Sequence, residues 1–131
     1  MSEKTYPDPV ITLESEQYWQ ACNDGMLLLK RCTDCGETHF YPRAICPHCF
    51  SDKTEWYESI GKGRIYSYSV TRRAEVPFAI AYVTLEEGVT MLSNIVDADL
   101  DALEIEQAVE VTFQESEGGQ SLPMFRPVDA A

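Results

Sequence analysis

Four cysteines form two Cys-x-x-Cys pairs, Cys32 with Cys35 and Cys46 with Cys49, and ten residues separate the pairs. Two such knuckles close together offer four thiolates, the ligand set of a tetrahedral structural zinc ribbon. Because protein sulfur would take all four positions, none is left for a catalytic water. The same sulfur set also accepts iron or serves as a redox dithiol, and both alternatives remain open. The spacing predicts one structural Zn2+ and favours a supporting module over an enzyme.

Three further side chains have reactive groups, and each has a plainer explanation. Cys22 falls on one helical face with Tyr18 and Trp19, which favours a packing role, and no adjacent cation activates its thiol. His39 and His48 both lie in the ribbon, and neither has a second group placed to orient a general base. The sequence has no Gly-x-Ser-x-Gly elbow and no glycine-rich phosphate loop. We therefore predict no catalytic residue in this chain.

The composition predicts one domain, or one domain with a metal-bound appendage. The 131 residues are 44% hydrophobic and 11% aromatic, enough for a packed core. No apolar run approaches the roughly 20 residues that cross a bilayer, and residues 1–9 lack the basic and apolar regions of a secretory signal. We expect a cytoplasmic protein without a membrane partner, in which paired cysteines bind metal rather than form disulfides.

Charge is spread unevenly along the chain. The net charge is −12, with +3 in residues 30–73 and −11 in residues 74–131. Nucleic-acid binding depends on Lys and Arg that release phosphate counterions, so this balance argues against a nucleic-acid partner. The basic middle is expected either to face one phosphate-bearing small molecule or to be an ordinary solvated surface. A nucleic-acid-binding ribbon and barrel, and a rubredoxin-like redox protein, remain the alternative functions.

The metal ligands need short elements around them. Pro7 and Pro9 favour an extended arm over residues 1–11, and a helix is expected at about 13–24, with Thr12 as its N-cap and Gly25 as its stop. A strand over residues 26–29 then enters the ribbon, which spans about 30–52 and contains a strand-like stretch at 38–41.

From residue 54 onward the sequence reads as all-β. Tyr66, Tyr68 and Val70 are expected on one face of their strand, and the strand at 78–85 is expected to be packed on both faces. Five strands in meander, with a short helix between the third and fourth, match a five-stranded Greek-key barrel of the OB type. The fold is therefore mainly β, with an arm, helix and rubredoxin-like zinc ribbon in residues 1–53 and an OB-fold barrel in 54–131. The expected runs are 56–60, 64–71, 78–85, 89–96, 97–103 (helix), 108–115 and 122–126.

Short motifs follow one another in a specific order over residues 13–128. They are Tyr18-Trp19, Leu27-Leu28-Leu29-Lys30-Arg31-Cys32, Cys35-Gly36, Phe40-Tyr41-Pro42-Arg43, Cys46-Pro47-His48-Cys49, Gly63-Arg64-Ile65-Tyr66-Ser67-Tyr68-Ser69-Val70 and Leu122-Pro123-Met124-Phe125-Arg126-Pro127. In this order they resemble the DUF35 family of zinc-ribbon and OB-fold proteins. The resemblance implies a non-catalytic subunit of a thiolase-like enzyme complex, in some members beside a hydratase, that works on acyl-CoA thioesters in lipid, steroid or aromatic metabolism.

The resemblance also suggests two surfaces. One surface would contact coenzyme A through charge and stacking, which is how OB barrels bind ligands on this part of their face. The alternative is that the tyrosines of this surface lie in the core and its arginines are solvated. The second would contact the thiolase-type partner through aromatic residues and arginine, and here the alternative is ordinary packing. The candidate coenzyme A residues are Lys62, Arg64, Tyr66, Tyr68, Arg72 and Arg73. The candidate partner residues are Tyr41, Arg43, Met124, Phe125 and Arg126.

Overall fold

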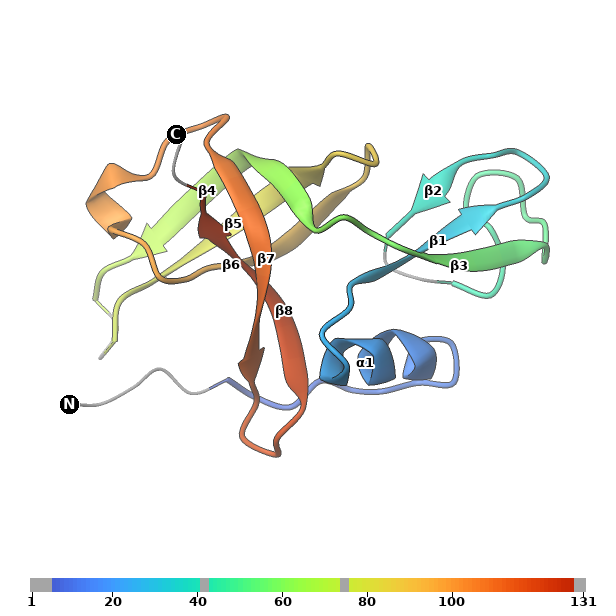
Figure 1. Cartoon of the computed structure of the whole chain (residues 1–131), viewed down its shortest axis with the longest axis horizontal. Coiled ribbons are helices and arrows are strands. Elements are labelled where there is room, and N and C mark those ends of the chain that lie inside the picture. Colours follow the sequence, from blue (N-terminus) through green and yellow to red (C-terminus); the bar gives the residue numbers. More distant parts are fainter. Residues whose placement is uncertain (1–5, 41–42, 74–75, 129–131) are drawn as a thin grey trace.

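The computed structural model describes residues 6–40, 43–73 and 76–128. One helix precedes a three-stranded sheet, and a closed five-stranded barrel follows (Figure 1). No helix among the described residues has the length and apolar character required to cross a bilayer. The elements are α1 (Glu16–Asn23), β1 (Leu28–Cys32), β2 (Thr38–His39), β3 (Thr54–Glu58), β4 (Lys62–Thr71), β5 (Phe78–Leu85), β6 (Thr90–Ile95), the 3-10 helix η1 (Leu100–Ala102), β7 (Ala108–Glu115) and β8 (Ser121–Pro127).

Helix α1 begins later than predicted and ends where predicted. A turn precedes the helix, in which the Ser15 N–H donates to the Thr12 carbonyl at 3.1 Å. The N-cap is therefore Ser15, and the prediction of Thr12 as the N-cap is wrong. At the other end Gly25 has φ +79°, the left-handed conformation that glycine adopts most easily. The N–H groups of Gly25 and Met26 donate to the carbonyls of Cys22 and Ala21, which is a Schellman motif.

The ribbon sheet has the order β2-β1-β3, with both pairings antiparallel. Strand β3 therefore pairs with β1, from Leu28 opposite Glu58 to Cys32 opposite Thr54, and not with any barrel strand. The expectation that strand structure from residue 54 onward belongs to the barrel is wrong for this first strand. A period of two in sequence indicates a strand but does not name its neighbour. The predicted boundary between residues 53 and 54 stays a prediction.

The barrel is closed in the order β4-β5-β6-β8-β7, and β4 pairs with β7. Strand β8 lies between β6 and β7, so the chain makes the Greek-key crossover of an OB fold rather than a simple meander. Strand β6 is parallel to β8 and meets it at one register position, Ile95 opposite Phe125. A Cβ placed on Gly63 would lie 2.5 Å from the Thr84 carbonyl oxygen, so only glycine allows β4 and β5 to approach this closely.

A β-bulge in β4 changes which side chains face the barrel interior. The pairing moves from Ile65 opposite Val83 to Ser67 opposite Tyr82, so Tyr66 is the extra residue. Tyr68 and Val70 pair with buried Ala81 and Ala79 and share the inner side, as predicted, whereas Tyr66 is 65% exposed. The prediction that Tyr66 shares their face is wrong, because the bulge shifts the alternation at that point.

Strand β5 has one buried face and one exposed face. Ala79, Ala81, Val83 and Leu85 point into the core, whereas Tyr82 on the other side is 49% exposed. The prediction of packing on both faces is wrong for this chain, because a closed barrel covers the inner face of each strand and no element of the described chain covers the outer face here.

One hydrophobic core joins the two halves. Tyr18 and Cys22 of α1 and Leu29 of β1 belong to the same buried cluster as Ile65 and Phe125 of the barrel. The long β7–β8 hairpin extends past the barrel toward α1 (Figure 1).

Hydrogen bonds hold the tip of the β7–β8 hairpin against the N-terminal segment. The Gln120 side chain donates to the Trp19 carbonyl at 2.8 Å. The N–H of Gly118 donates to the Asp8 carboxylate at 2.7 Å. The ends of the described chain thus stabilise each other's position.

Candidate metal centre

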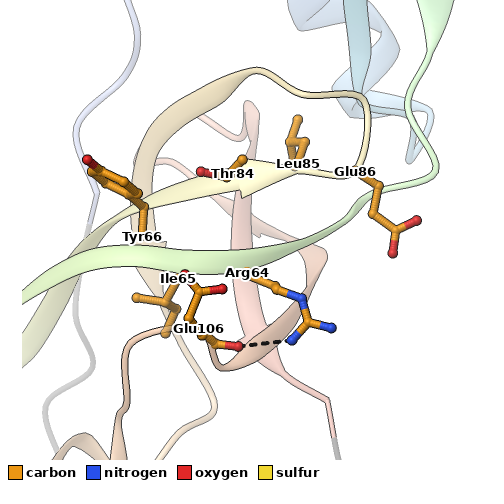
Figure 2. A pocket seen from close by; sticks show the side chains of 7 residues that line it. All are labelled: Arg64, Ile65, Tyr66, Thr84, Leu85, Glu86 and Glu106. Carbon is orange, nitrogen blue, oxygen red and sulfur yellow. Dashed lines mark hydrogen bonds between the residues drawn. The ribbon is translucent and has the colours of Figure 1, made fainter.

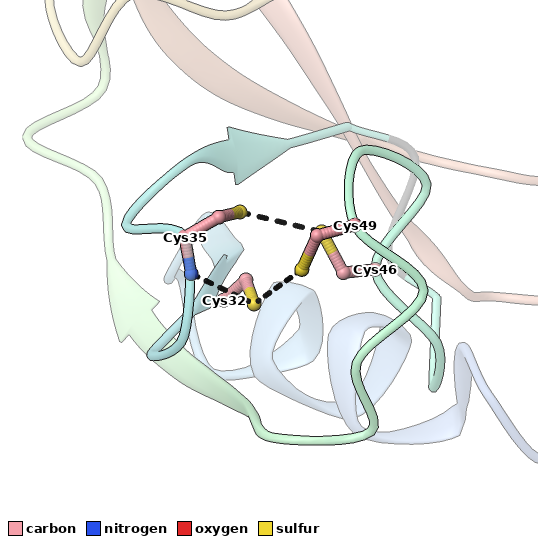
Figure 3. Close-up of side chains that lie close together, drawn as sticks. All are labelled: Cys32, Cys35, Cys46 and Cys49. Atoms are coloured by element: carbon pink, nitrogen blue, oxygen red, sulfur yellow. Dashed lines mark hydrogen bonds between the residues drawn. The ribbon is translucent and has the colours of Figure 1, made fainter.

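The four predicted metal ligands converge in one place between the two knuckles (Figure 3). Cys32 ends β1, Cys35 follows in the next turn, and Cys46 and Cys49 belong to the loop before β3. All four sulfur atoms lie within 4.8 Å of one another. This is the one group of three or more potential ligand side chains in the described part of the chain.

The sulfur geometry fits zinc. With Zn–S bonds of about 2.3 Å, tetrahedral sulfurs should lie roughly 3.8 Å apart. The Cys32–Cys49 sulfur distance is 3.5 Å and the Cys35–Cys46 distance is 3.7 Å. Four thiolates complete a tetrahedron, so the group serves as a structural centre for one Zn2+, as predicted.

Backbone N–H groups donate to two of the ligand sulfurs. The N–H of Cys35 donates to Cys32 Sγ at 3.5 Å and contributes most to lowering the pKa of that thiol to about 7. The N–H of His48 donates to Cys46 Sγ at 3.3 Å. The Cys32 thiol is thus the ligand that deprotonates most readily, which is the state that binds metal, whereas, against the opposing hydrogen bond from Ser51, the neighbouring cysteine sulfurs raise the pKa of the Cys49 thiol to about 12.

The two knuckles share a backbone shape but not a sequence. In each, the residue after the second cysteine donates its N–H to the carbonyl of the first: Gly36 to Cys32 and Phe50 to Cys46, both at 2.9 Å. Both residues have positive φ, +76° for Gly36 and +63° for Phe50. Glycine is a common turn residue, whereas phenylalanine gives no turn signal, so the shape of the second knuckle could not be predicted from Phe50.

Neither histidine nor the fifth cysteine forms an active site in the described structure. His39 is buried, and its Nε2 accepts the Arg43 N–H at 3.2 Å. Burial lowers the pKa of its imidazole, and its Nδ1 has no partner among the described residues. Cys22 is 1% exposed in the core, as predicted, and burial raises the pKa of its thiol to about 12.

The predicted coenzyme A residues divide between the two ends of β4. Arg64 and Tyr66 line a hollow of about 420 Å³ together with Thr84, Glu86 and Glu106 (Figure 2). The Arg64 guanidinium donates to the Glu106 carbonyl at 3.1 Å. Lys62 is exposed two residues before Arg64.

The rest of that set lies elsewhere. The Tyr68 hydroxyl donates to the Leu103 carbonyl at 2.8 Å, and Tyr68 is 38% exposed. Since Tyr66 is 65% exposed, neither Tyr66 nor Tyr68 is a core residue. Arg72 pairs with Asp101 at 2.5 Å, and both side chains are largely exposed. Arg73 follows Arg72 beyond the end of β4, and strand geometry places both roughly 25 Å from Arg64.

The predicted partner residues are similarly divided. Met124 and Phe125 are 4% and 0% exposed, so their side chains pack in the molecule rather than face a partner. Arg43 is exposed, and Arg126 pairs with Glu110 at 2.9 Å on the surface. Tyr41 lies outside the described residues.

Comparison with protein-family models gives two adjacent matches. Residues 19–55 match the rubredoxin-like zinc ribbon domain of ChsH2, and residues 56–114 match the ChsH2 C-terminal OB-fold domain. Among solved structures, the "Ltp2-ChsH2(DUF35) aldolase" is similar, with a TM-score of 0.81 and 31% identity over 92% of this chain and 98% of that one.

Three relatives with similar sequences are named as a scaffold protein or as enzyme subunits. A DUF35 domain-containing scaffold protein of Methanothermobacter thermautotrophicus is 42% identical over 64% of this chain and 68% of its own length. A probable enoyl-CoA hydratase alpha subunit of Thermomonospora curvata is 32% identical over 92% of this chain, which spans only 40% of that relative. The benzoylsuccinyl-CoA thiolase subunit BbsA of Geobacter metallireducens is 28% identical over 81% of this chain and 76% of its own length.

Proposed function

This chain belongs to the DUF35 family of zinc-ribbon and OB-fold proteins, and from that premise we propose that it is a non-catalytic subunit of a thiolase-like enzyme complex. In this proposal the partner enzyme supplies the reacting groups and acts on an acyl-CoA thioester. The zinc ribbon and barrel supply a rigid docking body, and a hydratase is a further candidate member of the complex.

The observation that carries the proposal is the extent of the structural match. The similarity to the DUF35 chain of an aldolase complex covers both halves of this molecule, including the relation of ribbon to barrel. A relative named as a thiolase subunit supports the same class of partner. The zinc centre, with four protein ligands, fits a structural role and leaves no position for substrate.

Co-purification tests the association. We expect the tagged chain, co-expressed with a thiolase-type enzyme from its own genome, to form a stoichiometric complex with at least 10-fold higher turnover of acyl-CoA than the enzyme alone. The isolated chain should show no turnover. Arg43→Glu reverses an exposed charge on the ribbon and should weaken the complex, whereas Lys53→Glu, an exposed charge reversal elsewhere on the ribbon, is the matched control. Absence of a complex with every such enzyme would refute the proposed function.

We further propose that the Arg64 end of β4 contributes to coenzyme A binding. Arg64 and the exposed Tyr66 ring line the same hollow, so a guanidinium suited to a phosphate and a ring suited to a stacked adenine are both available there. Lys62 adds positive charge nearby. Tyr68 lies farther along β4, and Arg72 and Arg73 lie beyond its end, so the proposal is strongest for Lys62, Arg64 and Tyr66.

The two ends of β4 can be compared directly. In the reconstituted complex, Arg64→Glu should raise the Kd for acyl-CoA at least about 10-fold, because it replaces an attractive charge by a repulsive one. Arg73→Glu makes the same charge change at the far end and should have a smaller effect. Calorimetric titration of the complex with a non-hydrolysable acyl-CoA measures both. Equal affinities for wild type and Arg64→Glu would place the coenzyme wholly on the partner.

A further inference from the structure

Two adjacent rows on the outer side of β4, β5 and β6 contain no charged side chain. Strand pairing sets Ser67, Tyr82 and Leu92 side by side across β4, β5 and β6. The next row contains Ser69, Ile80 and Asn94. Tyr82, Ile80 and Leu92 are 49%, 38% and 52% exposed. We call these six residues the neutral face; it is unusual in a chain with 24% charged residues.

The neutral face continues into a groove beside helix α1. Strand β6 meets β8 at one register position, so the two strands separate toward the Thr90 end of β6. The hollow that results is lined by Leu92 together with Trp19, Phe40, Leu122 and Pro123. No described residue that lines this hollow is charged. The uncharged surface thus extends from the barrel to the helix and ribbon, and Leu92 belongs to both parts.

A second copy of the chain is a poor occupant for this surface. The strands β5, β6 and β8 come from residues 74–131, which carry a net charge of −11 in a chain of −12. The exposed bases Lys62 and Arg64 of β4, and Arg73 beyond its end, lie outside the rows of the neutral face and are far fewer than these acids. Self-association would bring two strongly acidic molecules together, which net charge opposes. A protein with an apolar patch in neutral or basic surroundings fits better.

We infer that the neutral face and its groove are the surface that docks the catalytic thiolase-type subunit, through an apolar patch with neutral or basic surroundings. Tyr82 is the central anchor, since aromatic side chains at the centre of an interface contribute most to binding, and Leu92 adds apolar contact area beside it. The serines beside them are small and let the partner approach the sheet. This inference rests on the proposed function and names the surface that performs it.

The test uses the full chain with the thiolase-type enzyme that it co-purifies with. We expect Leu92→Glu and Tyr82→Glu to weaken the complex at least about 30-fold, because each buries a charge in an apolar interface. Ile105→Glu is the matched control: Ile105 is 54% exposed, like Leu92, but lies outside the neutral face, so its complex should keep the wild-type Kd. Zinc content and circular dichroism confirm that the variants are folded. Tyr82→Phe keeps the aromatic ring and should therefore bind like the wild type.

The outcomes separate this inference from the proposed function. If the wild type binds the enzyme and all three glutamate variants bind it with the same Kd, the neutral face is not the docking surface, and the proposed function still stands. Failure of the wild type to bind any such enzyme would remove both. Sedimentation of the isolated chain provides the remaining check, since a wild-type dimer that Leu92→Glu converts to monomer would show that the face joins copies of this chain instead.

Discussion

Replacing Cys46 by serine will release the zinc and unfold residues 30–53. Cys46 is fully buried, and its sulfur lies 3.7 Å from that of Cys35, so the substitution removes a ligand from the centre of the site. Little else holds this segment, because β2 has two residues and the two knuckle loops are mostly exposed. Structural zinc contributes about 10–16 kcal/mol of apparent binding free energy in zinc-finger peptides, so its loss exceeds what such a short sheet can offset.

Amide exchange measured by NMR, together with metal analysis, checks this expectation. Wild type should contain one zinc per chain, and Cys46→Ser should contain none and lose protection in the ribbon. Cys22→Ala is the matched control, since it also removes a buried cysteine but leaves the four ligands. A metal-free wild-type chain with a protected ribbon would contradict the zinc centre. Visible colour would instead indicate iron, because iron–thiolate sites absorb visible light and zinc sites do not.

Truncating Phe125 to alanine should have the largest effect of any single change in the barrel. The ring is fully buried, and the Phe125 carbonyl accepts the Val96 N–H at 2.8 Å where β6 and β8 meet. Loss of a buried phenylalanine costs about 3–5 kcal/mol, and for a chain of this size we expect a fall in Tm of roughly 10–25 °C.

Thermal unfolding of Phe125→Ala and Phe125→Leu gives the comparison. Leucine keeps most of the apolar volume and should cost less than half as much. Arg126→Ala changes an adjacent exposed residue and should leave Tm within about 2 °C, because exposed ion pairs contribute little. Equal Tm values for wild type and Phe125→Ala would contradict the placement of this ring in the core.

The metal centre was predictable because its ligands are local. Each Cys-x-x-Cys pair brings its sulfurs together within one turn, so spacing alone specified the ligand set. The barrel strands were predictable for a similar reason, since alternation and turn residues are local signals. Phe113 and Val109, for example, pack in or against the core as the period of two indicated.

The remaining features depend on distant contacts. The bulge at Tyr66 follows from how β4 fits β5, and the pairing of β3 with β1 places Trp56 beside Lys30, whose ammonium lies 4.7 Å from the ring centre. Exposure of the outer face of β5 likewise depends on the closed barrel. No signal within a short segment specifies such neighbours, which is why the coenzyme A and partner residues were predicted as runs and the structure then separated them.

The contacts between Trp19 and Gln120 and between Asp8 and Gly118 have a consequence for synthesis on the ribosome. A nascent chain that has reached Leu100 already contains every zinc ligand, so the ribbon can load its ion early. The apolar side of α1, however, has no strand β8 to cover it until residues 121–127 are translated. Until then that side stays exposed, and a chaperone or an already assembled catalytic subunit can bind it.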